Sequence, residues 1–217
     1  MSGFTSEDVK RLREQTGAGM MSCKEALVQC TGNFEKAVDY LRKKGLAAAE
    51  KKQGRIAAEG LVGSYIHNGK IGVMIEVNCE TDFVAKSSDF QNFVKDMAMQ
   101  VAATSPKFVK AEDMDEEFKR KEAEIYAAQL KNEGKPEHMI AKIVEGKIKK
   151  MAAEVCLIEQ PFIKNTDVTV KDLINELTLK LGEKIQVRRF TKFVLGEGIE
   201  KRQENFANEI AKMTGQQ

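Results

Sequence analysis

Residues 78–86 read NCETDFVAK, and we expect a β-strand to end here, the backbone to turn and a helical segment to begin. Thr81 and Asp82 are residue types that cap helices and tolerate turns. Phe83 and Val84 follow at once, which places them on an exposed corner. A phenylalanine on a loop is also commonly tucked back into its own core, so the residues alone leave two interpretations of Phe83 open.

The segments on either side predict a hairpin and a helix that hold this corner in place. Two β-rich runs meet at Asn68-Gly69, the pair that a type I′ turn prefers. A two-residue loop would pair His67 with Lys70 and would place six apolar residues on one face: Val62, Ile66, Ile71, Val73, Ile75 and Val77. The helix predicted from residue 88 to Ser105-Pro106 would pack on that face through Phe90, Phe93, Val94, Met97, Ala98 and Val101.

The N-terminal part predicts a small helical domain, residues 1–53. Capping boxes at residues 5–8 and 22–25 open the first two helices, and the third ends at Gly45. Met20 and Met21 lie in an exposed turn and are expected to be partly core. Residues 46–59, rich in alanine and charge, read as a linker helix with the domain boundary near Gln53-Gly54.

The remainder predicts a core domain over residues 54–198 and a C-terminal helix over residues 199–217. Residues 112–154 form two heavily charged helical patterns with a narrow apolar seam, which is typical of a protruding antiparallel coiled-coil arm. An edge strand at residues 156–163, a helix at 169–182 and a strand at 185–195 follow. The whole is an α+β fold with an antiparallel sheet.

Composition limits what the chain does. The 217 residues are 42% hydrophobic and 31% charged with a net charge of +2, which indicates a globular protein with no global attraction to nucleic acid or membranes. Four scattered cysteines support neither a zinc site nor a disulfide framework. With no apolar leader and no membrane-spanning run, we expect a cytoplasmic protein with no metal and no cofactor.

Motifs for nucleotide chemistry are absent from the sequence. It has no phosphate-binding loop, dinucleotide fingerprint or nucleophile elbow, so we expect no direct binding or hydrolysis of nucleotide. A rigidly mounted apolar loop on a scaffold with a small helical domain and an arm fits an interaction protein better than an enzyme.

Three stretches, in the right order along the chain, resemble the signatures of the bacterial-type translation elongation factor Ts family. They are residues 76–86, EVNCETDFVAK; residues 12–27, LREQTGAGMMSCKEAL; and residues 196–201, GEGIEK. The resemblance implies that residues 1–53 form a ubiquitin-associated-like module. It also implies a guanine-nucleotide exchange factor that binds elongation factor Tu, displaces magnesium and GDP, and leaves when GTP binds.

The same resemblance implies roles for individual residues. Thr81, Asp82, Phe83 and Val84 match the loop that disturbs the magnesium site, with Phe83 as a wedge between helices of the partner. The N-terminal module, with Met20 and Met21, and the C-terminal helix, with Phe206, match other partner contacts. His67 at the hairpin mouth is a further candidate contact.

One departure from the family pattern bears on assembly. Longer members contain two hairpin-plus-helix units, whereas this chain has one, over residues 61–101. We therefore expect a homodimer, and His67 could serve in the role of either unit.

A ribosome- or RNA-associated interaction module without exchange activity is the alternative. It would use Arg188, Arg189 and Lys192 together with the lysines of the arm, Lys147, Lys149 and Lys150. Sequence-independent RNA binding needs a basic stripe, and the near-neutral charge with acids interleaved along the arm argues against one.

Overall fold

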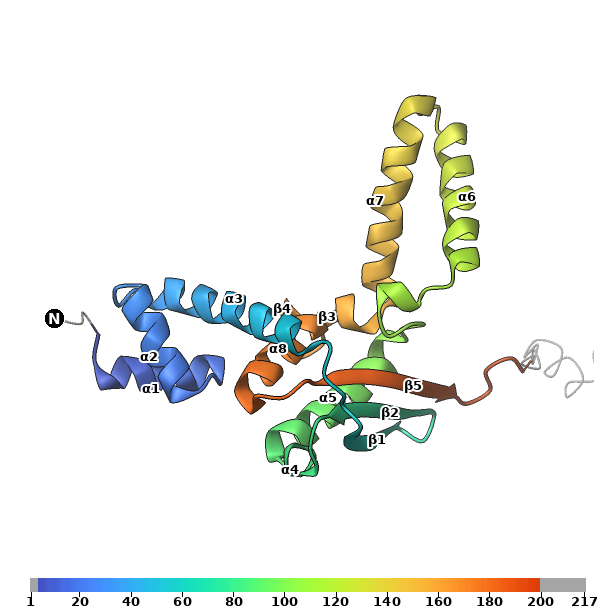
Figure 1. Ribbon diagram of the computed structural model, residues 1–217. Coiled ribbons are helices and arrows are strands. Elements are labelled where there is room, and N and C mark those ends of the chain that lie inside the picture. The colour runs from blue at the N-terminus through green and yellow to red at the C-terminus, as the bar shows by residue number, and fades with distance from the viewer. Residues whose placement is uncertain (1–3, 200–217) are drawn as a thin grey trace, which may run out of the picture.

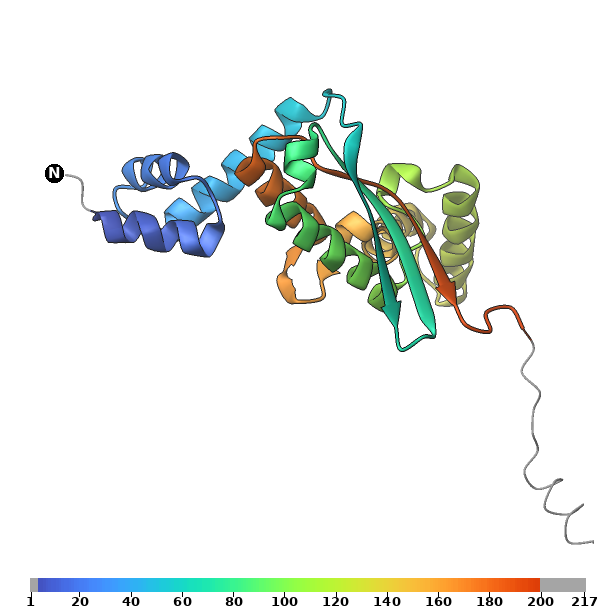
Figure 2. The ribbon, with the colours of Figure 1, turned by 90° about the horizontal axis from the view of Figure 1, so that it is seen from below.

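The hairpin predicted around Asn68-Gly69 forms the centre of an α+β fold. A computed structural model describes residues 4–199 (Figure 1). Strands β1 (Glu59–His67), β2 (Ile71–Cys79) and β5 (Gln186–Val194) form an antiparallel sheet in the order β1-β2-β5. Viewed from below, the three strands lie side by side with a marked twist (Figure 2).

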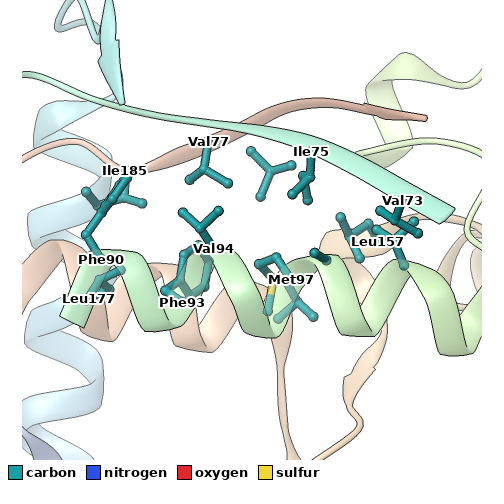
Figure 3. Packing of buried hydrophobic residues seen from close by; sticks show 14 of the residues in the cluster. Val73, Ile75, Val77, Phe90, Phe93, Val94, Met97, Leu157, Leu177 and Ile185 are labelled. Carbon is teal, nitrogen blue, oxygen red and sulfur yellow. The ribbon is translucent and has the colours of Figure 1, made fainter. Parts of the chain in front are cut away.

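The main core lies between one face of this sheet and helix α5 (Ser88–Thr104). Alternate residues of β2 point toward α5, and the predicted stripe of α5 is buried against them (Figure 3). Burying an aliphatic or aromatic side chain of this size stabilises the fold by roughly 1.5–3 kcal/mol. The buried set is Val73, Ile75, Val77, Phe90, Phe93, Val94, Met97, Ala98 and Val101.

The turn prediction is confirmed, but the predicted register is wrong by one residue. Asn68 and Gly69 both have positive φ, and Lys70 N–H donates to the His67 carbonyl at 2.9 Å. The pairing of β1 with β2 begins with His67 opposite Ile71, so Lys70 is left unpaired between the two strands. The carbonyl oxygen of Lys70 instead accepts the N–H of Leu195, in the segment after β5, at 2.8 Å.

This slip turns β1 over, because side chains alternate between the two faces of a strand. Val62 and Ile66, predicted to share the inner face with Val73, lie on the outer face and are 65% and 66% exposed. With Met74 and Phe193 they form an exposed apolar patch, which we call the outer sheet face.

The N-terminal module consists of α1 (Ser6–Thr16), α2 (Met20–Gln29) and α3 (Phe34–Lys52). The capping box at Thr5 and Asp8 is confirmed, whereas the one predicted at residues 22–25 is wrong because α2 begins earlier, after the cap residue Gly19. The third helix does not end at Gly45. It continues to Lys52 because α3 packs against α8 (Val170–Leu181) here and buries Gly45, where an added Cβ would make ordinary van der Waals contact with the Asn175 carbonyl oxygen at 3.6 Å.

The helical pair predicted at residues 112–154 consists of α6 (Glu116–Asn132) and α7 (Glu137–Val155), preceded by a 3₁₀ turn, Ala111–Asp113. The pair projects away from the sheet (Figure 1). Leu130 and Ile140 are buried near its tip. At its base Met114, Met151 and Cys156 form a separate small cluster.

The segment after the arm differs from the predicted edge strand. Leu157–Glu159 is a 3₁₀ turn, and β3 (Pro161–Phe162) pairs with β4 (Asn165–Thr169) in a small second sheet. Buried Gln100 of α5 organises this region by donating to the Pro161 carbonyl and accepting from Ile163 N–H. These bonds satisfy backbone groups that a main-sheet strand would have paired with a neighbouring strand.

Four free cysteines lie in this fold: Cys23, Cys79 and Cys156 are buried and Cys30 is half-buried. Within residues 4–199 no helix has the length and apolarity needed to cross a membrane. The predicted C-terminal helix, including Phe206, lies outside the described residues apart from Ile199.

Candidate functional site

The turn after β2 is a single helical turn with a threonine cap. Thr81 has extended backbone angles, its hydroxyl accepts the N–H of Val84 at 3.4 Å, and its carbonyl accepts the N–H of Ala85 at 3.2 Å. Helix α4 (Asp82–Ala85) follows and contacts β1, β2 and α5. Of its side chains only that of Ala85 is buried. We call the four residues Thr81, Asp82, Phe83 and Val84 the 81–84 loop.

Phe83 projects from this loop into solvent. Its side chain is 81% exposed, whereas Phe90 at the start of α5 is fully buried. Val84 is half-buried and packs on the edge of the main core. The exposed interpretation of Phe83 is therefore the correct one, and the core is complete without its ring.

Asp82 is the charged member of the loop. Its carboxylate accepts a hydrogen bond from Lys86 Nζ at 2.7 Å, and this bond lowers the pKa of Asp82 below its ordinary value. Both side chains are exposed. Any cation or donor that approached the Asp82 carboxylate would therefore compete with Lys86.

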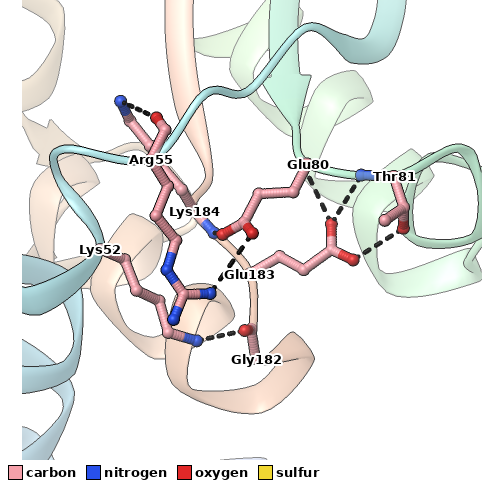
Figure 4. Close-up of polar contacts among 7 residues, drawn as sticks. All are labelled: Lys52, Arg55, Glu80, Thr81, Gly182, Glu183 and Lys184. Carbon is pink, nitrogen blue, oxygen red and sulfur yellow. Dashed lines mark hydrogen bonds and ion pairs between the residues drawn. The ribbon is translucent and has the colours of Figure 1, made fainter.

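Two glutamates tie the start of the loop to the turn between α8 and β5 (Figure 4). Glu183 accepts the backbone N–H groups of Glu80 and Thr81, both at 3.0 Å, and the Thr81 hydroxyl at 2.7 Å. In return Glu80 accepts the backbone N–H of Lys184 at 2.7 Å, and this bond is the main cause of its lowered pKa.

The segment after α3 joins the same network. Lys184 Nζ donates to the carbonyl oxygens of Gln53 and Arg55 at 2.7 and 3.0 Å, and Arg55 pairs with Glu80 at 3.3 Å. Lys52 Nζ donates to the Gly182 carbonyl. The sequence contained no signal for Glu183, since nothing local distinguishes it from the other acidic residues and its partners lie about 100 positions away.

The other predicted contact residues are spread over the molecule. Met20 and Met21 occupy the first turn of α2 and are both exposed, 46% and 76%, so the expectation that they are partly core is wrong. In both views α2 lies apart from α4 (Figures 1 and 2). His67 is hydrogen-bonded to Tyr65 at the far end of the hairpin. Strand β2 separates His67 from the 81–84 loop, and its nine residues span about 26 Å at the usual rise per residue.

Three of the six basic residues weighed for RNA binding are ion-paired. Arg188 and Arg189 both pair with Glu76, at 2.8 and 2.7 Å, and Lys149 pairs with Glu145 at 3.0 Å. Lys192 Nζ donates to the Ala102 carbonyl at 2.8 Å. Glu76 therefore offsets part of the positive charge along β5, where a phosphate backbone would need a continuous basic stripe.

The site presents a surface suited to docking. Residues 4–199 contain no group of three or more histidine, cysteine or acidic side chains placed to hold a metal ion. What the site presents is one exposed aromatic ring and one exposed carboxylate on a turn that hydrogen bonds hold at both ends.

Comparison with known proteins gives a consistent result. A family model described as Elongation factor TS matches residues 8–197. The chain is 58% identical to an elongation factor Ts from Alkaliphilus oremlandii, over 98% of this chain and 99% of the relative. It is 58% identical to one from Desulforamulus reducens, over 97% and 98%, and 56% identical to one from Geobacter sulfurreducens, over 98% and 99%.

Proposed function

This chain belongs to the elongation factor Ts family, and we propose that it is the guanine-nucleotide exchange factor of elongation factor Tu in translation elongation. It binds the GDP form of that partner, displaces magnesium and GDP, and is released when GTP binds. The chain itself neither binds nucleotide nor acts as an enzyme on it.

The observation that carries this proposal is the exposure of Phe83 on a turn with a defined conformation. A ring that is 81% exposed does little for the stability of its own chain. Exposed aromatic residues on a pre-organised backbone are, however, effective anchors for a partner, because little conformational entropy is lost when they bind. We assign Phe83 the role of a wedge, with Thr81, Asp82 and Val84 shaping the turn.

The energetics of exchange set a requirement on this wedge. The factor speeds GDP release only if it binds the nucleotide-free partner more tightly than the GDP-bound partner, and linkage makes GDP and the factor weaken each other by the same ratio. An apolar ring meets this requirement if its pocket in the partner opens when magnesium and GDP leave. A pocket that is equally open in both states would give binding without exchange.

We place the remaining contacts on separate parts of the chain. Met20 and Met21 offer exposed thioether side chains on the N-terminal module, residues 1–53. His67 offers a contact in the core domain, residues 54–198, at the end of the hairpin away from the 81–84 loop. Phe206 offers a further contact in residues 199–217. A partner that touched all of them would have to span the length of the molecule.

We further propose that the chain is a homodimer in which the outer sheet face of one copy covers that of another. The patch combines exposed Val62, Ile66, Met74 and Phe193 with the ion pairs of Glu76. A patch of this kind is self-complementary across a two-fold axis, as a symmetric dimer requires. It would supply the second hairpin-plus-helix unit that the longer family members carry in one chain.

Phe83→Ala tests the exchange function. Elongation factor Tu is loaded with fluorescent GDP, and the rate of its release is followed as the factor is added. We expect wild type to accelerate release and Phe83→Ala to lose this activity by roughly 10- to 100-fold, the range for losing 1.4–2.8 kcal/mol at an interface anchor.

Ile125→Ala is the matched control, because Ile125 is an exposed apolar residue on the arm, 50% exposed. It should exchange like wild type. A wild-type chain that leaves GDP release unchanged would refute the proposed function. If Phe83→Ala exchanged normally, the function could stand but the wedge would be wrongly assigned.

A further inference from the structure

We propose that Glu183 is a positioning residue for the 81–84 loop: its carboxylate sets the backbone from which Phe83 projects, without itself touching the partner. The inference rests on the proposed exchange function. It assigns to that function a residue about 100 positions from the loop in sequence, on the turn between α8 and β5.

The Glu183 carboxylate uses both oxygens on the first two residues of the turn. One oxygen accepts the N–H groups of Glu80 and Thr81, each at 3.0 Å, and the other accepts the Thr81 hydroxyl at 2.7 Å. Because that hydroxyl donates its proton to Glu183, a lone pair of the same oxygen is left to accept the N–H of Val84. Glu183 therefore orients the cap of α4 as well as the strand end before it.

The turn depends on such a support because little of it is buried. One helical turn is not stable in isolation, since the ordering of its residues is offset by only one or two hydrogen bonds. Phe83 is exposed and Ala85 is the only fully buried side chain of α4. The conformation of the loop must therefore be imposed by neighbouring segments.

Glu183 is itself held in place. Its neighbour Lys184 donates its backbone N–H to Glu80 at 2.7 Å and its Nζ to the Gln53 and Arg55 carbonyls (Figure 4). Glu183 thus binds the backbone of Glu80 and Thr81, Glu80 binds the backbone of Lys184, and the segment after α3 closes the network. A carboxylate fixed in this way acts as a rigid acceptor for the loop.

Loss of Glu183 should lower the fraction of molecules with a correctly shaped loop. The apparent affinity of a binding site falls in proportion to the fraction that is competent to bind. Glu183→Ala should therefore reduce stimulation of GDP release by roughly tenfold at a sub-saturating concentration of factor. Glu183→Gln should retain most of the activity, because its amide oxygen still accepts both backbone N–H groups.

The direct measurement is hydrogen–deuterium exchange of the backbone amides in residues 78–86 of the free chain. Glu183→Ala should speed deuterium uptake there and leave uptake in α5 unchanged. Glu159→Ala is the matched control: its carboxylate is also partly buried and ion-paired, with Lys171, but it does not contact the loop. It should change neither uptake nor GDP release.

A double mutant separates positioning from direct contact. If Glu183 acts through Phe83, then Glu183→Ala combined with Phe83→Ala should release GDP at the same rate as Phe83→Ala alone. Multiplicative losses would overturn the inference, because they would mean that Glu183 makes a contact of its own.

Unchanged deuterium uptake in residues 78–86 of Glu183→Ala would also overturn the inference that Glu183 positions the loop, whatever the rate of GDP release. Should Glu183→Ala fail to fold, Glu183→Asp takes its place: the shorter side chain leaves the Thr81 cap intact, draws the carboxylate away from all three donors and must also speed uptake in residues 78–86. Failure of wild type to release GDP would instead count against the proposed function, while the deuterium measurement would still decide whether Glu183 orders the loop.

Discussion

Phe83 and Phe90 are the same residue type a short distance apart in the chain, and they have opposite surroundings. Phe83 is 81% exposed on α4, and Phe90 is fully buried under the sheet. Truncating Phe90 to alanine should cost about 3–5 kcal/mol of unfolding free energy, as for a core phenylalanine. Phe83→Ala should stay within about 0.5 kcal/mol of wild type in a thermal or denaturant melt. A large loss for Phe83→Ala would mean that the ring belongs to the core.

Protonation of Glu76 should destabilise the sheet at low pH. Hydrogen bonds from Arg188 and then Arg189 lower its pKa from the ordinary 4.5 to about 2. A lowered pKa stabilises the folded state above the ordinary pKa, and this contribution is lost as the pH falls toward the folded value.

We therefore expect the melting temperature of wild type to fall more steeply between pH 4.5 and pH 2 than that of Glu76→Gln. At pH 7 the variant should melt at a lower temperature than wild type. Glu145→Gln, which removes an exposed pair on the arm, should change the profile little. Parallel pH profiles for wild type and Glu76→Gln would show that the two arginines do not stabilise the fold through Glu76.

At the scale of elements, β1 and α5 approach each other closely at Gly63. A Cβ added to this glycine would lie 2.4 Å from Cγ1 of Val94, a stiff side chain that is 3% exposed. Gly63 therefore lets the helix lie directly on the hairpin, which in turn places α4 at the end of β2.

Gly63→Ala should destabilise the chain by about 1–3 kcal/mol, as overpacking of a core does. The cost should be smaller when Val94 is already alanine, because the added methyl group then has space. Gly72→Ala is the control, since its Cβ would meet only the end of the Ile66 side chain, at 3.3 Å. The free energy of unfolding is measured in denaturant melts of Gly63→Ala, Val94→Ala, the double variant and Gly72→Ala. An equal cost of Gly63→Ala with valine and with alanine at position 94 would rule out the clash.

At the scale of the whole molecule, the sheet has one covered and one uncovered face. Helix α5 covers the inner face, while the four apolar residues of the outer sheet face are between 55% and 67% exposed in the described part of the chain. Exposed apolar patches of this kind commonly mark an interaction surface. The proposed homodimer would bury it.

Light scattering tests the dimer. Wild type should have twice the 24.3 kDa mass of one chain, and Phe193→Asp should be monomeric because it places a charge within an apolar contact. Ile125→Asp on the arm should remain dimeric. A monomeric wild type would leave the outer sheet face free for another partner and would contradict the proposed assembly.

The sequence by itself determined those features that depend on residues close together in the chain. The turn at Asn68 and Gly69, the caps at Thr5 and Thr81, the helix at residues 169–182 and the apolar stripe of α5 are all as predicted. Each results from backbone preferences or hydrogen bonds that span at most four residues. The exposure of Phe83, in contrast, was one of two interpretations that the residues alone left open, and the structure decided between them.

Only the tertiary structure decided the features that depend on distant segments. Lys70 is unpaired between β1 and β2, and its carbonyl oxygen accepts a hydrogen bond from the segment after β5. The resulting one-residue shift in register moves Val62 and Ile66 to the outer face. Gly45, locally a helix terminator, stays inside α3 because α8 packs against it. Glu183 reaches Thr81 across about 100 positions. A local backbone preference, such as that of glycine against a helix, is worth only about 1 kcal/mol, so packing against a distant element outweighs it. Nothing in a sequence marks which glutamate will bind which backbone N–H.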